Sequence, residues 1–244
     1  MIDFSQPVPA RQTFVLSYLA IRRSLGMLGF LLPLALGPVG YFILGIPIQE
    51  NMSSYYHTGL RDVFVGIVCA IGLFLFCYRG ADLIENWTGN FACFSAIGLA
   101  LCPIELNSDP LNQSTIAGFL HSVFGAGFFL TLAVYSLVHF PRSSQLLAVT
   151  SRSGQRDAIY RATGLTILGS MILMGFQLFL APADWKAFLN KWNFIFWMEW
   201  ITIWAFSLAW LTKGHAILAR LQEEEQPDKN WLGLPEKLKA VGLG

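Results

Sequence analysis

Apolar residues in this chain gather in long runs that are separated by short polar segments. Each run is close in length to the about 20 mainly apolar residues that a membrane-spanning helix needs, and the third run is the shortest. The pattern predicts an all-α fold, a polytopic membrane helical bundle with six transmembrane helices in one domain over residues 24–212. The predicted spans are 24–46, 62–79, 89–104, 115–140, 162–181 and 192–212.

Both ends of the chain lie outside these runs. Residues 1–23 are predicted to form a cytoplasmic or interfacial N-terminal segment, because apolar and polar positions mix there as in a short amphipathic helix. Residues 213–244 are predicted to be a cytoplasmic tail that stays helical through Arg220 and then becomes acidic and solvated. Pro33 and Pro38 fall inside the first run and predict a kink or local opening of that helix.

The composition agrees with a membrane protein. Of 244 residues, 55% are hydrophobic and 13% are charged, which is about half the charged fraction of an ordinary soluble domain. The net charge of +1 gives no electrostatic basis for binding nucleic acid. The four cysteines lie in or at the ends of the apolar runs without CxxC spacing, which favours small buried residues over disulfides or metal ligands.

Basic residues are divided unevenly between the two sets of loops. With the N-terminus inside, the inner segments carry 13 Lys and Arg residues and the outer segments carry 3. Because cytoplasmic loops carry an excess of Lys and Arg, both termini are predicted to be cytoplasmic. The basic loop over 141–161 is explained by topology alone, with contact to anionic lipid headgroups as the alternative.

Several ionisable residues fall inside or beside the runs, where burial in lipid is costly and usually functional. His121 and Glu199 each lie about seven residues from the outer ends of their runs, so both are predicted about 10 Å below the outer surface. His57 and Asp62 lie at the outer mouth of the second run, in the most polar stretch of the first half. Together these residues predict one polar pocket that opens outward between helices.

Three kinds of chemistry are open to this pocket. The first is a zinc site with His57 and His121 as metal ligands, whose bound water would be a nucleophile at neutral pH. Asp62 or Glu199 would then supply a third ligand or a general base, and Ser53 or Ser54 would hydrogen-bond the water or an oxyanion. The second is a metal-free proton relay or ligand pocket, and the third is a structural hydrogen-bond network. No HxxxH or HExxH spacing is present, so spacing alone does not select zinc.

Several short motifs resemble a group of bacterial six-span membrane proteins. The resemblance covers most of residues 20–215 and implies six helices in a bacterial inner (plasma) membrane, with no assigned activity. The motifs are Ser53-Ser54-Tyr55-Tyr56-His57-Thr58, Arg61-Asp62, Phe64-Val65-Gly66, Tyr78-Arg79-Gly80-Ala81-Asp82, His121 with Phe128-Phe129, Arg156-Asp157-x-x-Tyr160-Arg161, Glu199-Trp200 and Trp210-Leu211-x-Lys213-Gly214.

A more distant resemblance is to the ceramidase and progestin/adiponectin-receptor superfamily of membrane hydrolases. Its members hold zinc with an S-x-x-x-H element, an Asp and further His, and Ser53 with His57 fits that element. The chain departs from that superfamily, which has seven spans and an H-x-x-x-H on the last one, because its own last run carries Glu199 instead. The resemblance implies zinc held by histidine and a lipid-like substrate.

Two hypotheses of function follow. The leading one is a zinc-dependent membrane hydrolase of a lipid or other amphiphile. The alternative is a non-enzymatic membrane protein that binds lipid or a small ligand, passes a solute, or serves as a subunit of a larger complex or homo-oligomer. Membrane lipids are the expected partners in both. Transport would require polar residues through the inner half, where the sequence offers chiefly Tyr135 and His139.

Overall fold

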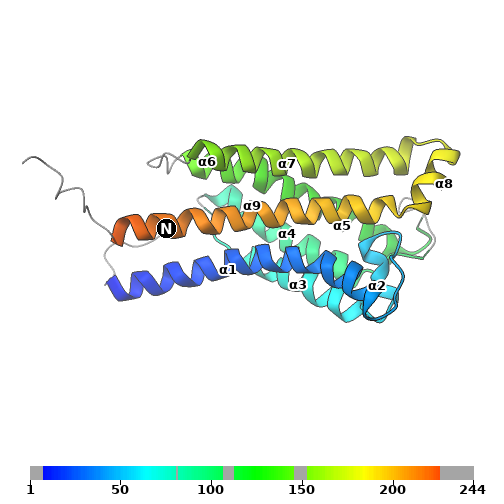
Figure 1. Cartoon of the computed structure of the whole chain (residues 1–244), viewed down its shortest axis with the longest axis horizontal. Helices are drawn as coiled ribbons and strands as arrows, with labels where there is room; N and C mark the ends of the chain where they lie inside the picture. Colours follow the sequence, from blue (N-terminus) through cyan, green and yellow to red (C-terminus); the bar gives the residue numbers. More distant parts are fainter. Residues whose placement is uncertain (1–7, 81, 107–112, 146–152, 226–244) are drawn as a thin grey trace, which may run out of the picture.

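The computed structural model describes residues 8–80, 82–106, 113–145 and 153–225, and their side chains over 19–80, 82–106, 113–142 and 154–214. Within these residues every regular element is helical, so the predicted all-α fold is confirmed (Figure 1). The long helices are α1 (Val8–Leu34), α3 (Arg61–Cys77), α4 (Leu83–Leu101), α5 (Ile116–Val134), α7 (Ser153–Gly175) and α9 (Phe194–Glu225).

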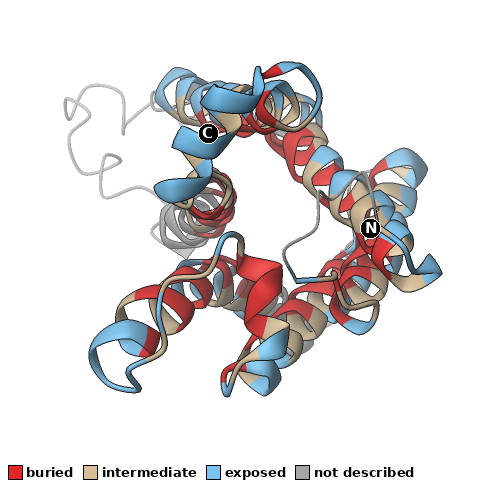
Figure 2. Ribbon diagram, turned by 90° about the vertical axis from the view of Figure 1, so that its right-hand side faces the viewer, coloured by how far each residue is buried: buried red, intermediate tan, exposed pale blue. Residues whose placement is uncertain are grey.

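These six helices of the described chain form a ring. Each packs against the next one in the order α1, α3, α4, α5, α7, α9, and α9 closes the ring against α1. Figure 2 shows the ring end-on, with buried residues on the sides that face inward. We call the end that holds α2 (Gly40–Phe42) and α8 (Ala183–Lys191) the plug end. The opposite end, which holds α6 (Phe140–Gln145), is called the terminal end (Figure 1).

Four of the described helices are long and apolar enough to cross a membrane, which supports the predicted membrane assignment. Among the other two, α3 has 17 residues, and α4 carries Glu85, Asn86 and Asn90 in its first turns. Crossing by all six helices therefore stays a prediction. The four candidate spans are Leu19–Phe42, Ile116–Arg142, Gly154–Leu180 and Phe194–Gly214.

The predicted opening of the first helix is confirmed. After Leu34 the helix widens into a π-helical stretch, Ala35–Val39, that contains Pro38. Proline has no backbone N–H to donate within the helix, so a local change of winding at this point is expected. Gly37 in this stretch allows close packing, because a β-carbon there would lie 2.6 Å from the ring of Trp200.

Helices α1, α4 and α9 each extend beyond the apolar run that predicted them. Helix α1 continues unbroken from Val8 to Leu34, so the described part of 1–23 belongs to the first helix and no separate interfacial helix precedes it there. Helix α4 begins at Leu83, before the predicted 89, because the Asp82 carboxylate caps it by accepting from the Glu85 amide. Helix α9 reaches Glu225, and the rest of the predicted tail lies outside the described residues.

An aromatic cluster fills the ring toward the terminal end. Trp210 is completely buried, and its ring lies edge-on to Tyr78 at 4.9 Å and to Phe140 at 5.0 Å between ring centroids. Tyr135 and Phe206 flank the same indole at 5.5 and 5.9 Å. Edge-to-face contacts of this kind favour one arrangement of rings over others. The cluster therefore gives this half of the ring a solid interior.

We expect Gly89→Ala to destabilise the protein by about 1–3 kcal/mol, the usual cost of overpacking. A β-carbon at Gly89 would lie 2.7 Å from the carbonyl oxygen of Leu75, a backbone atom of α3 that cannot rotate away. Gly169→Ala is the matched control, because nothing lies within 4 Å of a β-carbon there. Thermal denaturation in detergent measures both variants, and equal midpoints would contradict the close packing of α3 on α4.

Candidate functional site

The polar stretch between the first two apolar runs folds into the mouth of the ring. Residues Met52–His57 form a 3-10 helix, which we call the plug. Asn51 begins it: the Asn51 side-chain oxygen accepts from the Ser54 amide at 2.8 Å and from the Ser54 hydroxyl at 3.0 Å. Met52 through Tyr55 are buried. The first four residues of the plug are therefore buried at the plug end of the ring, and His57, at the end of the plug, is exposed there.

Helix α9 holds the plug in place. The Glu199 carboxylate accepts from the Met52 amide at 2.6 Å. One turn earlier, the Phe196 amide donates to the carbonyl oxygen of Glu50 at 3.0 Å, and Asn193 Nδ2 donates to that of Ile48 at 3.3 Å. The start of α9 thus binds the segment that leads into the plug, and Glu199 is one of the residues that hold the plug in place.

The two predicted metal-binding histidines each contact the segment that follows α4. Nε2 of His57 lies 2.6 Å from the carbonyl oxygen of Ile104, and Nδ1 of His121 lies 2.7 Å from that of Cys102. A ring nitrogen that bonds a carbonyl carries a proton and has no lone pair for a metal. Each imidazole therefore has one nitrogen committed to the backbone.

A small cavity lies under the plug. It has a volume of about 30 Å³ and is lined mainly by apolar residues of α1, α3, α4, α5 and α9, including Leu32, Phe64 and Phe128. Its polar members are Ser53 of the plug and Glu199 of α9. A volume of this size holds about two water molecules. The structure thus brings two of the predicted site residues to one cavity.

The other predicted site residues do not reach this cavity. Asp62 is exposed in the first turn of α3, while His57 and His121 bind the carbonyls described above. Among the described residues, no group of three or more His, Cys, Asp or Glu side chains is placed to hold a metal ion. The zinc site thus stays a prediction without a matching ligand set.

A second polar cluster, at the terminal end, was missed by sequence reasoning. Nη2 of Arg22 donates to the Tyr78 hydroxyl at 3.1 Å, and that hydroxyl donates to Glu85 Oε1 at 2.8 Å. The Tyr135 hydroxyl donates to the Glu85 carbonyl at 3.3 Å. All four residues are buried. The expectation that this half carries few polar groups was wrong, because Arg22 and Glu85 lie just outside the apolar runs but inside the ring.

Lys213 belongs to the same cluster. It is 5% exposed, and its ammonium lies 5.3 Å from the ring centroid of Phe140 and 5.8 Å from that of Tyr160. Aromatic faces stabilise a cation, more so where water is excluded. Lys213 is the first residue after the sixth apolar run, so its burial could have been suspected only if the helix was known to continue inside the ring.

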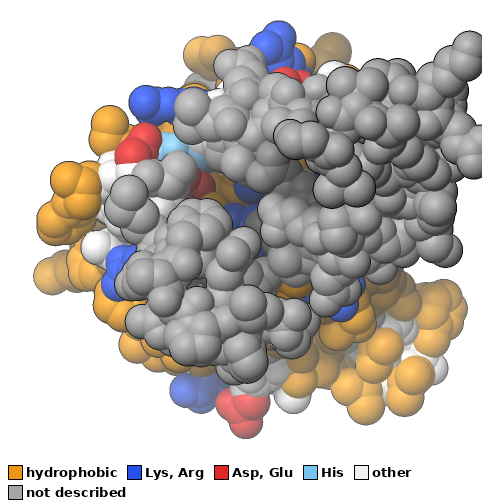
Figure 3. Space-filling view, turned by 90° about the vertical axis from the view of Figure 1, so that its left-hand side faces the viewer, with side chains coloured by type: hydrophobic (Ala, Val, Ile, Leu, Met, Phe, Trp, Pro, Cys, Tyr) orange, Lys and Arg blue, Asp and Glu red, His pale blue; other side chains and the backbone are white. Residues whose placement is uncertain are grey.

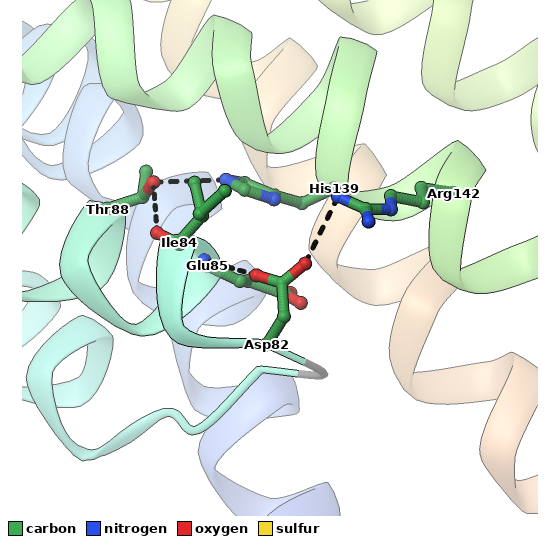
Figure 4. Close-up of polar contacts among 6 residues, drawn as sticks. All are labelled: Asp82, Ile84, Glu85, Thr88, His139 and Arg142. Atoms are coloured by element: carbon green, nitrogen blue, oxygen red, sulfur yellow. Dashed lines mark hydrogen bonds and ion pairs between the residues drawn. The ribbon is translucent and has the colours of Figure 1, made fainter.

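Figure 4 shows how the edge of this cluster is fixed. Asp82 pairs with Arg142, with 3.1 Å between Oδ2 and Nη1. Nε2 of His139 lies 3.0 Å from the Thr88 hydroxyl, which itself donates to the carbonyl of Ile84. The amide of Glu85 and, less strongly, the nearby Arg142 hold the pKa of Asp82 below its usual value. These contacts join the start of α4 to α6 and to the π-helical stretch Tyr135–His139 that precedes it.

At the plug end, a carboxylate organises the segment between α4 and α5. Glu105 accepts from the Ser114 hydroxyl at 2.9 Å and from the amides of Ser114 and Thr115 at 3.1 and 2.7 Å. Bonds from the Thr115 side chain first, and then from Ser114, lower the pKa of Glu105 to about 2. The charged form therefore stabilises the start of α5.

No protein-family model, curated protein or solved structure matches the chain. The two resemblances described from sequence motifs therefore stay predictions, and function must be argued from the two polar sites themselves.

Replacing Tyr78 by Phe removes the hydroxyl that links Arg22 to Glu85. We expect a loss of about 1–3 kcal/mol, the cost of leaving buried hydrogen-bonding groups unsatisfied. Tyr41→Phe is the control, because Tyr41 is exposed. Thermal denaturation of both purified variants tests this, and a Tyr78→Phe midpoint equal to that of the control would show that the link is not stabilising.

Glu105 should make the fold sensitive to acid. Its folded pKa of about 2 lies below the usual 4.5, so its stabilisation is present above pH 4.5 and is lost as the pH falls toward 2. We expect Glu105→Gln to lower the denaturation midpoint at neutral pH, and the difference from wild type to shrink across that window. Asp184→Asn, on exposed α8, is the control. A difference independent of pH would contradict this assignment.

Proposed function

We propose that this chain is an integral membrane protein of a bacterial plasma membrane and that all six ring helices cross the bilayer. At 1.5 Å per residue, the 17 residues of α3 and the 19 of α4 give about 26 and 28 Å, close to the about 30 Å of a hydrocarbon core. The excess of Lys and Arg on the segments at the terminal end supports placing that end in the cytoplasm. The plug end then faces outward.

We further propose that the protein binds a small amphiphilic ligand in the cavity under the plug and does not act on it chemically. The observation that carries this proposal is a carboxylate, Glu199, at the wall of a cavity that is otherwise apolar except for Ser53. A carboxylate accepts hydrogen bonds and attracts cations. The ligand is therefore expected to have a short apolar body and an amine or hydroxyl head that meets Glu199 and Ser53.

Movement of the plug would admit this ligand. The cavity holds only about two waters, and Met52 and Ser53 of the plug form part of its wall. The Glu199 carboxylate now accepts from the Met52 amide. A ligand that competes for this carboxylate weakens the same bond that holds the plug, so ligand binding and plug opening would be coupled.

Binding is favoured over the other hypotheses for two reasons. Hydrolysis by zinc needs about three protein ligands around the metal, and the described residues offer no such group. Passage of a solute needs a polar lining through the ring. On α9, between the cavity residue Ile203 and the terminal end, lie instead Phe206 and Trp210, both of them buried.

Short-chain probes that differ only in their head group test the ligand class. Hexylamine and hexan-1-ol are expected to raise the denaturation midpoint of the purified protein, and hexanoate is not, because its charge repels Glu199. Glu199→Gln should weaken hexylamine binding at least about tenfold, the loss expected for a charge-assisted hydrogen bond.

Glu105→Gln serves as the control, because Glu105 also lies at the plug end but outside the cavity lining. It should keep the preference for hexylamine. Stabilisation by hexanoate as strong as by hexylamine, or an unchanged preference in Glu199→Gln, would refute the proposed ligand class.

A further inference from the structure

Helix α8 lies across the plug end, between the end of α7 and the start of α9. Asp184 is in its first turn and Lys191 in its last turn, so both charges are favourable to the helix dipole. Figure 1 shows α8 at a large angle to α7 and α9. The candidate spans on either side end at Leu180 and begin at Phe194. Helix α8 therefore lies at the level where the proposed bilayer meets water.

One face of α8 is held against the end of the preceding helix. Nζ of Lys186 donates to the carbonyl oxygen of Leu178 at 2.7 Å, and Nε2 of Gln177 donates to the side-chain oxygen of Asn190 at 2.6 Å. Lys186 and Asn190 are four residues apart, so they lie on the same side of α8. These two contacts fix the direction in which each face of α8 points.

The other side of α8 carries three aromatic side chains, Trp185, Phe188 and Trp192, which we call the aromatic stripe. At about 100° per residue they fall within about 60° of one another, roughly opposite Lys186 and Asn190. They are 61%, 63% and 63% exposed. Contacts that hold α8 to the protein thus turn an apolar face away from it.

A second copy of this chain is a poor match for the aromatic stripe. Its side chains are about 60% exposed, and aromatic side chains of about 150–250 Å² each then offer roughly 300–450 Å² in total. A stable interface between proteins buries about 800 Å² on each partner. A bilayer needs no such area, because the ring helices also hold the protein in it. Tryptophan is typical of the boundary between lipid and water, where its ring is apolar and its N–H is polar.

Basic side chains support the placement of α8 at the outer surface. Figure 3 shows Lys and Arg side chains at the rim and near the centre of the terminal end. Because cytoplasmic segments carry an excess of Lys and Arg, that end is placed in the cytoplasm. Helix α8, at the opposite end, then faces the outer leaflet.

We propose that the aromatic stripe of α8 binds the outer leaflet of the bilayer, with its rings between the phospholipid headgroups and the acyl chains. Helices of this kind lie in the plane of the membrane with the apolar face buried by about 5–10 Å. Lys191, exposed in the last turn, extends toward lipid phosphates. This inference rests on the proposed membrane orientation and adds a lipid-binding surface outside the six ring helices.

Photo-cross-linking compares two exposed sides of α8. The photoreactive residue p-benzoylphenylalanine takes the place of Phe188 in one variant and of Ala187 in another, in the full chain reconstituted into vesicles of phosphatidylethanolamine and phosphatidylglycerol. Ala187 is also exposed but points about 100° away around the helix. Mass spectrometry is expected to find several-fold more lipid attached at Phe188 than at Ala187. Should the Phe188 variant not fold, Trp185 takes its place.

A third position, Leu130, controls for the bilayer itself, because it is 51% exposed in the candidate span Ile116–Arg142. Lipid attached at Leu130, with no more at Phe188 than at Ala187, would overturn the lipid-binding role of α8 and leave the membrane assignment standing. No lipid at any of the three positions would overturn both. A cross-link from Phe188 to a second copy of the chain, in place of lipid, would also refute this proposal.

Discussion

The packing of α9 against α1 is the contact on which the rest of the structure depends. It closes the ring, and glycines make it close: a β-carbon at Gly26 would lie 2.6 Å from Leu211, and one at Gly29 would lie 2.5 Å from Ser207. Helix α9 also supplies one charged residue to each polar site. Glu199 and Lys213 are 14 residues apart along it, about 21 Å by helical rise, so this single helix sets the separation of the two ends.

The two ends compensate their buried polar groups differently. At the plug end, Glu199 accepts from a backbone amide, and its cavity is otherwise largely apolar. At the terminal end, Arg22, Tyr78 and Glu85 bond one another through side chains. The aromatic cluster around Trp210 borders the terminal cluster on the side of the cavity. The buried aromatic side chains therefore separate the two polar sites, which do not form one continuous polar path.

The apolar runs were enough to place the helices, because a membrane span is long and its hydropathy signal is strong. Helical rise also gave Glu199 and His121 a depth near the plug end. It could not give the direction of either side chain, which depends on how neighbouring helices pack. The first run begins after Arg22, and the sixth ends before Lys213, because a charged residue lowers the hydropathy and so marks a boundary. A ring of helices buries such residues when their neighbours supply partners, and those partners come from other helices.

The positions of the histidines follow from the end of α4. The last carbonyls of a helix have no partner within it, and in an apolar setting each unsatisfied carbonyl is costly. Cys102 is the residue at which α4 ends, and its carbonyl meets His121, while that of Ile104 meets His57. Two imidazoles near one surface of the bundle resemble a metal site when only sequence and depth are considered. Here the same two side chains bond backbone carbonyls just past the end of α4, and this shared segment accounts for their closeness in depth.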